Sequence, residues 1–144
     1  MFKYKFPKAD ITVDVIIVNK KDEMLLVKRK NEPYKDCWAI PGGYLNVGKE
    51  SIEDAARREV KEETDLDTMV KFWNYYDTPD RDPRGVTITM VFIALVLNDV
   101  VATAGDDAKE VKWVKIDEVL NENLAFDHKK IITEFMKCFE PKHK

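Results

Sequence analysis

Few of the residues that build disulfide frameworks, histidine metal sites or membrane spans occur in this sequence. Its 144 residues include only two histidines and two cysteines, and Cys37 and Cys138 lie far apart outside any motif. A histidine-based metal site and a disulfide scaffold are therefore not expected, and we expect reduced thiols, as in a cytoplasmic protein. No apolar run approaches the ~20 residues of a membrane span, and the first ten residues lack the apolar segment of a signal peptide.

An excess of basic residues is also lacking. Lysine and arginine total 24 against 27 acidic residues, so the net charge of −3 gives no electrostatic reason to expect nucleic-acid binding. The hydrophobic share of 44% and the charged share of 35% are those of an ordinary globular protein, and no internal repeat is visible. At this length the sequence predicts a single domain over residues 1–144.

Hydrophobic patterning predicts an α/β protein of the mixed, α+β type. β-branched and aromatic residues predict strands at 11–18, 23–29, 38–40, 70–77, 86–97 and 111–116. Helical periodicity predicts a helix that begins after Ser51 and ends near residue 64, a helical turn at 117–119, and a last helix at 127–139. This order favours a mixed β-sheet flanked by helices over a regular doubly wound fold.

The helix predicted after Ser51 carries carboxylates on its buried side. At ~100° per residue its apolar side chains cluster around Ile52, and Glu59 and Glu63 project within ~20° of the same direction. Glu62 projects beside Ala55. The solvated face of this helix is supplied by other charged residues, namely Glu53, Asp54, Arg57 and Lys61.

Carboxylates that face inward are costly unless they are paired or bound to a cation. Arg58 can neutralise only one of them, most simply Glu62 at i+4. Oxygen ligands without a nearby histidine or cysteine suit Mg²⁺, with Mn²⁺ as a substitute. An acidic face in contact with solvent is the alternative interpretation, and the direction of Glu59 and Glu63 argues against it.

Residues 43–66 resemble the Nudix box, G-x5-E-x7-R-E-U-x-E-E-x-G-U, in which U is aliphatic. Glu50 is followed by seven residues and then by the segment RE-V-K-EE that begins at Arg58, a highly specific spacing. Two departures occur: six residues instead of five separate Gly43 from Glu50, and Asp65 replaces the usual glycine. The extra residue falls in the loop before the helix, and aspartate tolerates the left-handed conformation often needed at this position. We therefore expect the glutamate geometry to survive.

Less specific motifs outside the box resemble the ADP-ribose pyrophosphatase branch of this superfamily. They are Pro79 and residues 28–34, 38–43, 81–85, 106–108 and 124–128. The resemblance implies an α/β/α sandwich with a central mixed β-sheet, Mg²⁺-dependent hydrolysis of a small nucleotide substrate, and a homodimer. Phe2, Tyr4 and Phe6 could serve the dimer or cover the core of the domain itself.

The resemblance also assigns roles to the acidic residues. Glu59, Glu62 and Glu63 carry over as metal ligands or, for one of them, as a catalytic base. Glu50 is a further ligand, a group that supports the ligands, or a first-turn glutamate favoured by the helix dipole. Glu110 is the candidate for a general base outside the box, with a surface glutamate as the alternative.

Further roles fall to an arginine and to glycines of the same region. Arg58 is expected to orient a carboxylate in the catalytic group without touching the substrate. Gly43 and its neighbour Gly42 let the backbone approach the metal or a phosphate closely, or form a simple turn.

Three arginines are candidates for contacts to phosphate or to the terminal ribose, because a guanidinium matches phosphate oxygens. They are Arg29, Arg81 and Arg84, each of which could instead be solvated, and Asp82 could pair with either of its arginine neighbours.

Aromatic residues are candidates for stacking on adenine. Tyr34, Phe126 and Trp38 have suitable rings, and core packing is the default for Trp38. Asp127 is predicted to cap the last helix and His128 to lie at its surface, and neither is given a catalytic role.

The leading hypothesis is hydrolysis of ADP-ribose to AMP and ribose 5-phosphate by water attack on the pyrophosphate. One alternative is a pyrophosphohydrolase of nucleoside triphosphates. Another is a non-catalytic Nudix-like sensor, which the intact set of glutamates disfavours. Sensors of that kind join a Nudix domain to a DNA-binding domain, for which residues 128–144 leave no room.

Overall fold

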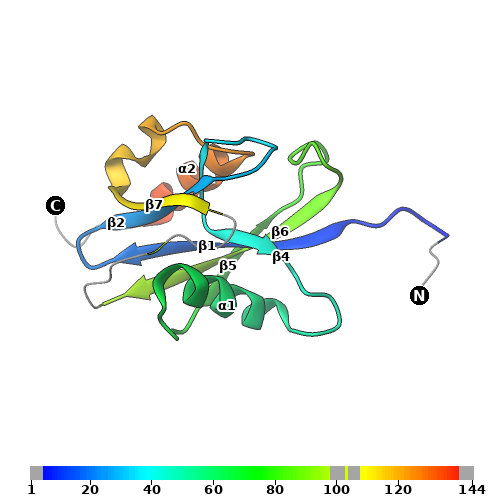
Figure 1. The fold of residues 1–144 in the computed structure, drawn as a ribbon, viewed down its shortest axis with the longest axis horizontal. Helices are drawn as coiled ribbons and strands as arrows, with labels where there is room; N and C mark the ends of the chain where they lie inside the picture. Colours follow the sequence, from blue (N-terminus) through cyan, green and yellow to red (C-terminus); the bar gives the residue numbers. More distant parts are fainter. Residues whose placement is uncertain (1–4, 98–102, 104–107, 140–144) are drawn as a thin grey trace.

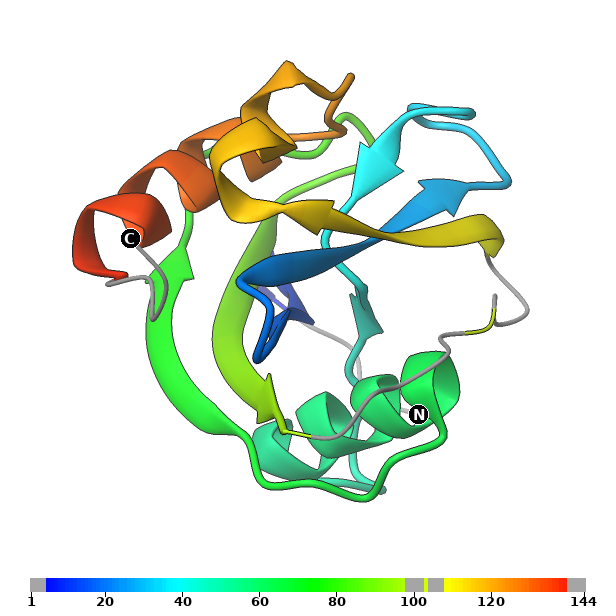
Figure 2. The ribbon, with the colours of Figure 1, turned by 90° about the vertical axis from the view of Figure 1, so that its left-hand side faces the viewer.

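A mixed β-sheet between two helices forms the body of the protein (Figures 1 and 2). The structure is a computed structural model that describes residues 5–97, 103 and 108–139. Phe2, Tyr4 and residues 106–107 of the predicted motifs lie outside the described residues. The predicted α/β/α sandwich with a central mixed sheet is confirmed.

The helices and strands follow the predicted order closely. They are β1 (Asp10–Asn19), β2 (Glu23–Arg29), β3 (Trp38–Ala39), β4 (Gly42–Tyr44), α1 (Ile52–Thr64), β5 (Lys71–Tyr76), β6 (Thr87–Val96), β7 (Ala108–Lys115), the 3-10 helix η1 (Ile116–Asn121) and α2 (His128–Cys138). The sequence did not predict β4, because its two glycines contribute no side chains to a hydrophobic pattern.

The sheet runs in the order β3-β2-β1-β6-β5, with β4 paired to β1 and β7 paired to β2. β1 and β6 are parallel along their whole length, whereas the other pairs are antiparallel. The predicted hairpin of β1 and β2 pairs at Val18↔Met24, beside its turn. Farther along, β1 pairs with β4 while β2 pairs with β3, so the two strands separate. β7 pairs with β2 from Glu23 to Arg29.

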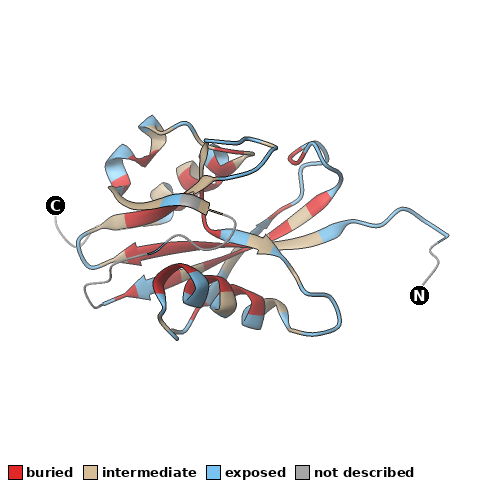
Figure 3. Ribbon diagram, viewed as in Figure 1, coloured by how far each residue is buried: buried red, intermediate tan, exposed pale blue. Residues whose placement is uncertain are grey.

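Alternate residues of β1 face the two helices, as the period of two in a strand requires. Val13, Val15 and Ile17 pack in a cluster with the buried alanines of α1. Ile16 and Val18 pack with the apolar face of α2. The residues of both clusters are almost completely buried, and Figure 3 shows buried stretches in the sheet and in both helices. Asp14 has the same phase along β1 as Ile16, which directs it to the α2 side.

Two further features bear on expectations from the sequence. Cys37 and Cys138 are free cysteines. Among the described residues, no helix is both long and apolar enough to cross a membrane. Phe6 is 69% exposed, so its part in a dimer stays a prediction.

Candidate active site

A cavity of about 560 Å³ opens between β1 and β2, where these strands separate. α1 contributes acidic side chains to it, and we call Glu59, Glu62 and Glu63 the carboxylate wall. β2 and the segments that precede β6 and α2 contribute basic and aromatic side chains, and we call Arg29, Arg84 and Phe126 the arginine wall. The cavity therefore has opposite charge on two of its sides.

The local sequence fixes the direction of the carboxylate wall. Ser51 caps α1 by accepting a hydrogen bond from the Asp54 amide at 3.0 Å, and Asp65 ends the helix in the left-handed conformation, with φ 60°. Between these caps Glu59 and Glu63 are 6% and 8% exposed, as their helical direction predicted.

Arg58 connects the acidic groups of the site. Its Nε and Nη2 donate to the two carboxylate oxygens of Glu50, each at 3.0 Å. Its Nη1 donates to Glu59 and to Glu62, each at 3.1 Å. The pairing with Glu62 agrees with the sequence, and the pairing with Glu50 explains why the pKa of the Glu50 carboxyl lies below its usual value.

One carboxyl of the wall has a strongly perturbed pKa. Burial and the charge of Glu62 together raise the pKa of Glu59 to about 7, although Arg58 opposes both effects. Glu63 also raises this pKa. The negative charge on Glu59 is therefore undercompensated within the protein, which is the situation that a bound cation relieves.

The residues present fit a hard divalent cation. The wall offers only carboxylate oxygens, and Gly43 faces it so closely that a Cβ there would lie 2.9 Å from Oε1 of Glu59. Within the described part of the chain no three Asp, Glu, His or Cys side chains already converge as a metal site. Arg58 holds oxygens of Glu59 and Glu62, which a cation would have to share.

The arginine wall is built on one aromatic ring. The guanidinium carbon of Arg29 lies 4.9 Å from the ring centre of Phe126, and that of Arg84 lies 5.6 Å from it. Arg84 also lies 5.2 Å from the ring centre of Tyr44 and is held by Asp82, whose carboxylate accepts from its Nε and Nη2. Asp82 thus pairs with Arg84, one of the two pairings left open by the sequence.

Arg81 does not join this wall, although it touches the cavity. It is 8% exposed, and its guanidinium donates to both oxygens of Asp127, at 3.0 and 2.8 Å, and to Thr87 at 2.7 Å. These contacts occupy Nε, Nη1 and Nη2 of Arg81, the donors that would otherwise bind a phosphate. Asp127 lies at the N-cap of α2, as predicted, but its side chain makes no capping hydrogen bond.

The expectation that His128 lies at the surface is wrong. His128 is 3% exposed, lines the cavity and accepts a hydrogen bond from the Ile40 amide at its Nδ1. Beside it lies Asp14 of β1, also buried, which accepts a hydrogen bond from Thr89. Reasoning from the sequence missed both residues: the only signal for Asp14 was an acid in a buried strand, and His128, at the start of a helix, had no local signal of burial.

The profile of the NUDIX domain matches residues 8–135 of this chain. The chain belongs to the Nudix family. It is 47% identical to the ADP-ribose pyrophosphatase of Methanocaldococcus jannaschii. The match extends over 122 residues, which are 84% of this chain and 70% of that relative. These matches show that the protein is a Nudix pyrophosphohydrolase.

Solved structures of other Nudix proteins have the same fold. The NUDIX domain of NrtR from Shewanella oneidensis, crystallised with ADP-ribose, superposes with a TM-score of 0.83 at 28% identity over 92% of this chain and 90% of that one. A bifunctional NMN adenylyltransferase/ADP-ribose pyrophosphatase from Francisella tularensis, in complex with AMP and a manganese ion, superposes with a TM-score of 0.78. It is 32% identical over 93% of this chain and 43% of its own length.

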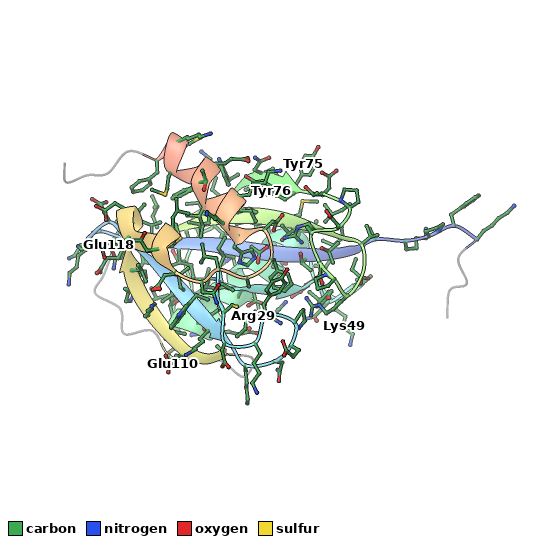
Figure 4. The ribbon with its side chains drawn as sticks, turned by 90° about the horizontal axis from the view of Figure 1, so that it is seen from above. Arg29, Lys49, Tyr75, Tyr76, Glu110 and Glu118 are labelled. Carbon is green, nitrogen blue, oxygen red and sulfur yellow. The ribbon has the colours of Figure 1, made fainter. Side chains whose placement is uncertain are left out.

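The remaining candidate residues of this Nudix protein lie outside the cavity. Glu110 is exposed on β7 opposite Lys28, and Figure 4 shows it at the margin of the molecule. Its placement does not support a role as general base. Tyr34 is 38% exposed and contacts the outer side of the site through Phe126, with 4.8 Å between ring centres. Trp38 packs against the core on the α2 side.

Proposed function

We propose that this Nudix protein hydrolyses ADP-ribose to AMP and ribose 5-phosphate in a reaction that depends on Mg²⁺. The observation that carries the proposal is the pair of walls in one cavity, with carboxylates for a cation on one side and arginines beside an aromatic ring on the other. A pyrophosphate linked to two nucleoside-like groups matches this distribution of charge. The 47% identical ADP-ribose pyrophosphatase supports the same substrate.

Each group of the site would have a distinct part in this reaction. Glu59 and Glu63 would hold the cation beside the backbone at Gly43, and the cation would neutralise the pyrophosphate oxygens and activate water. Glu50 would hold the guanidinium of Arg58, and Arg58 would in turn keep the carboxylates of Glu59 and Glu62 in place. Arg84 would contact a phosphate or the terminal ribose, because Asp82 holds its guanidinium at the cavity.

The general base would come from the carboxylate wall. Glu62 is the member of the wall with the greater exposure, its side chain being 47% accessible, so a water molecule could reach it. Glu63 is the second candidate for this role, and Mn²⁺ could replace Mg²⁺ because both prefer oxygen ligands.

The release of AMP from ADP-ribose by the purified protein with Mg²⁺ tests this proposal. We expect turnover by the wild type, its loss in Glu63→Gln, and its retention in Glu53→Gln, which changes an exposed glutamate on the opposite face of α1. Wild-type turnover no greater than that of Glu63→Gln would exclude the proposed reaction.

Nucleoside triphosphates are the alternative substrates. This chain is also 34% identical to a putative 8-oxo-dGTP diphosphatase of Bacillus subtilis. The match extends over 102 residues and covers 69% of this chain and 62% of that relative. Comparing kcat/KM for ADP-ribose with that for triphosphates would separate the two activities. Any Mg²⁺-dependent hydrolysis would exclude a protein that only binds its nucleotide.

The organisation of the molecule is part of the proposal. We infer one domain over residues 1–144 that acts as a homodimer on a small nucleotide, without nucleic acid or membrane as a partner. Sedimentation equilibrium of the purified chain would test the dimer, and a mass equal to that of one chain would exclude it.

A further inference from the structure

Two polar side chains on the floor of the cavity have no part in the roles given above. Asp14 comes from β1 and His128 from the first residue of α2. Their side chains are 10% and 4% exposed, and both line the cavity. Polar groups buried to this extent normally have hydrogen-bond partners, so the partners already present show which atoms of the pair are left to bind a ligand.

The hydrogen-bond partners of His128 define which nitrogen carries its proton. Nδ1 accepts from the backbone N–H of Ile40 at 3.0 Å, so this nitrogen has no hydrogen of its own. Burial lowers the pKa of His128, which favours the neutral ring even though the charge of Asp14 opposes the effect. In the neutral ring the proton is then on Nε2, which makes this atom a donor.

Asp14 presents one carboxylate oxygen to that donor. Its Oδ2 accepts from the hydroxyl of Thr89, which fixes the carboxylate. Its Oδ1 lies 3.7 Å from Nε2 of His128, too far for a hydrogen bond. A Cβ on Gly42 would come within 2.4 Å of the same oxygen, so the glycine leaves space for it.

A donor and an acceptor 3.7 Å apart are suited to one kind of group. A single oxygen can lie about 2.8 Å from both atoms, accept from Nε2 and donate to Oδ1. A hydroxyl does both, whereas a phosphate oxygen cannot donate and would be repelled by the carboxylate, and an amide nitrogen cannot accept. We propose that Asp14 and His128 bind a ribose hydroxyl of the substrate and so contribute to its selection.

This inference rests on the proposed substrate and is tested with ADP-ribose analogues that each lack one ribose hydroxyl. We expect kcat/KM of the wild type to fall about 10- to 100-fold for one analogue, since hydrogen bonds to charged groups have effects of this size. The other analogues are expected to react like ADP-ribose.

Two variants assign the effect to the pair. In Asp14→Asn, which removes the charge of the acceptor, ADP-ribose itself should react more slowly and the difference between it and the sensitive analogue should shrink to a few-fold. Glu134→Gln changes a carboxylate that binds the hydroxyl of Tyr76 and does not line the cavity, so it should keep the full wild-type difference.

The outcomes separate this inference from the proposed function. If the wild type does not hydrolyse ADP-ribose, the proposed reaction fails, and the Kd values of ADP-ribose and the same analogues for the wild type then decide the hydroxyl site. If kcat/KM, or Kd where there is no turnover, agrees within about 2-fold for ADP-ribose and all analogues, the hydroxyl site is overturned. Only water would then lie between Asp14 and His128. A selectivity unchanged in Asp14→Asn would overturn it as well. Should that variant not fold, the wild-type analogue series decides alone.

Discussion

Arg58 binds both carboxylate oxygens of Glu50 at 3.0 Å, and the same guanidinium reaches Glu59 and Glu62 at 3.1 Å. Glu50 precedes the N-cap of α1, so it anchors the arginine from outside the helix that carries the carboxylate wall. Its predicted alternative, a first-turn glutamate, does not describe this position. The geometry is that of a group that orients metal ligands.

The first prediction concerns this pairing. In Arg58→Lys the single ammonium cannot replace the planar fork, so activity should fall about 10- to 100-fold, the range typical for groups that orient metal ligands. Arg57→Lys is the matched control, since Arg57 is on the exposed face and pairs with Asp67. Steady-state kinetics on both variants checks the expectation, and equal rates for the two would contradict it.

The second prediction uses the raised pKa of Glu59. A rise from 4.5 to about 7 favours the metal-free folded state below pH 4.5, and this stabilisation is lost as pH increases to about 7. The loss amounts to about 3 kcal/mol at 1.36 kcal/mol per pKa unit. With a chelator present, Glu59→Gln should therefore gain stability over the wild type between pH 5 and pH 8.

Urea unfolding of both proteins at the two pH values measures this gain. Groups that titrate equally in both, such as His128, cancel in the difference between wild type and variant. Added Mg²⁺ should stabilise the wild type more at pH 8 than at pH 5, because the carboxylate must lose its proton to bind a metal. A difference between the proteins that does not change with pH would refute the assignment.

The third prediction contrasts two adjacent glycines. In Gly43→Ala the new Cβ would lie 2.9 Å from a side-chain oxygen of Glu59, which can move, so activity should fall while stability changes little. In Gly42→Ala it would lie 2.2 Å from the backbone oxygen of Val13, so the pairing of β4 with β1 must shift. We expect Gly42→Ala to lose about 1–3 kcal/mol of stability, as in overpacked cores. Thermal unfolding and kinetics together test the contrast, and the reverse pattern would disprove it.

The fourth prediction separates two arginines of one loop. Arg81→Ala leaves Asp127, whose side chain is 15% exposed, without its partner, which should cost about 3 kcal/mol of folding free energy. Arg84 has a side chain that is 40% exposed at the cavity, so Arg84→Ala should raise KM, and it should also lower the melting temperature, because it leaves Asp82, whose side chain is 3% exposed, without its partner. If Arg81→Ala melted like the wild type, its contacts with Asp127 and Thr87 would not have the structural role given to them here.

The parts of the site that the sequence predicted are local ones. The caps of α1 and the inward direction of Glu59 and Glu63 follow from positions three and four residues apart, which share one helix face. The Nudix box adds the sequence spacing between Glu50 and Arg58. These relations hold within a single helix and the loop before it, and so they can be predicted without the rest of the chain.

The relations that the sequence did not predict join distant segments. Arg81 has its partner at the start of α2, and His128 has its partners on the segment before β4 and on β1. An arginine or a histidine gives no local sign of such a partner, so a phosphate contact and a surface position were expected for them. Only the packing of α2 against the sheet brings these residues together.

The separation of β1 from β2 places the groups proposed for catalysis and those proposed for substrate recognition on different parts of the molecule. The half formed by β1, β4 and α1 holds the groups proposed for chemistry, while Arg29 and the segments at 80–85 and 124–127 hold much of what would read the rest of the substrate. Libraries that vary only this second half would leave the helix caps and the carboxylates as they are. Retargeting the enzyme by directed evolution therefore has a natural starting point in these loops.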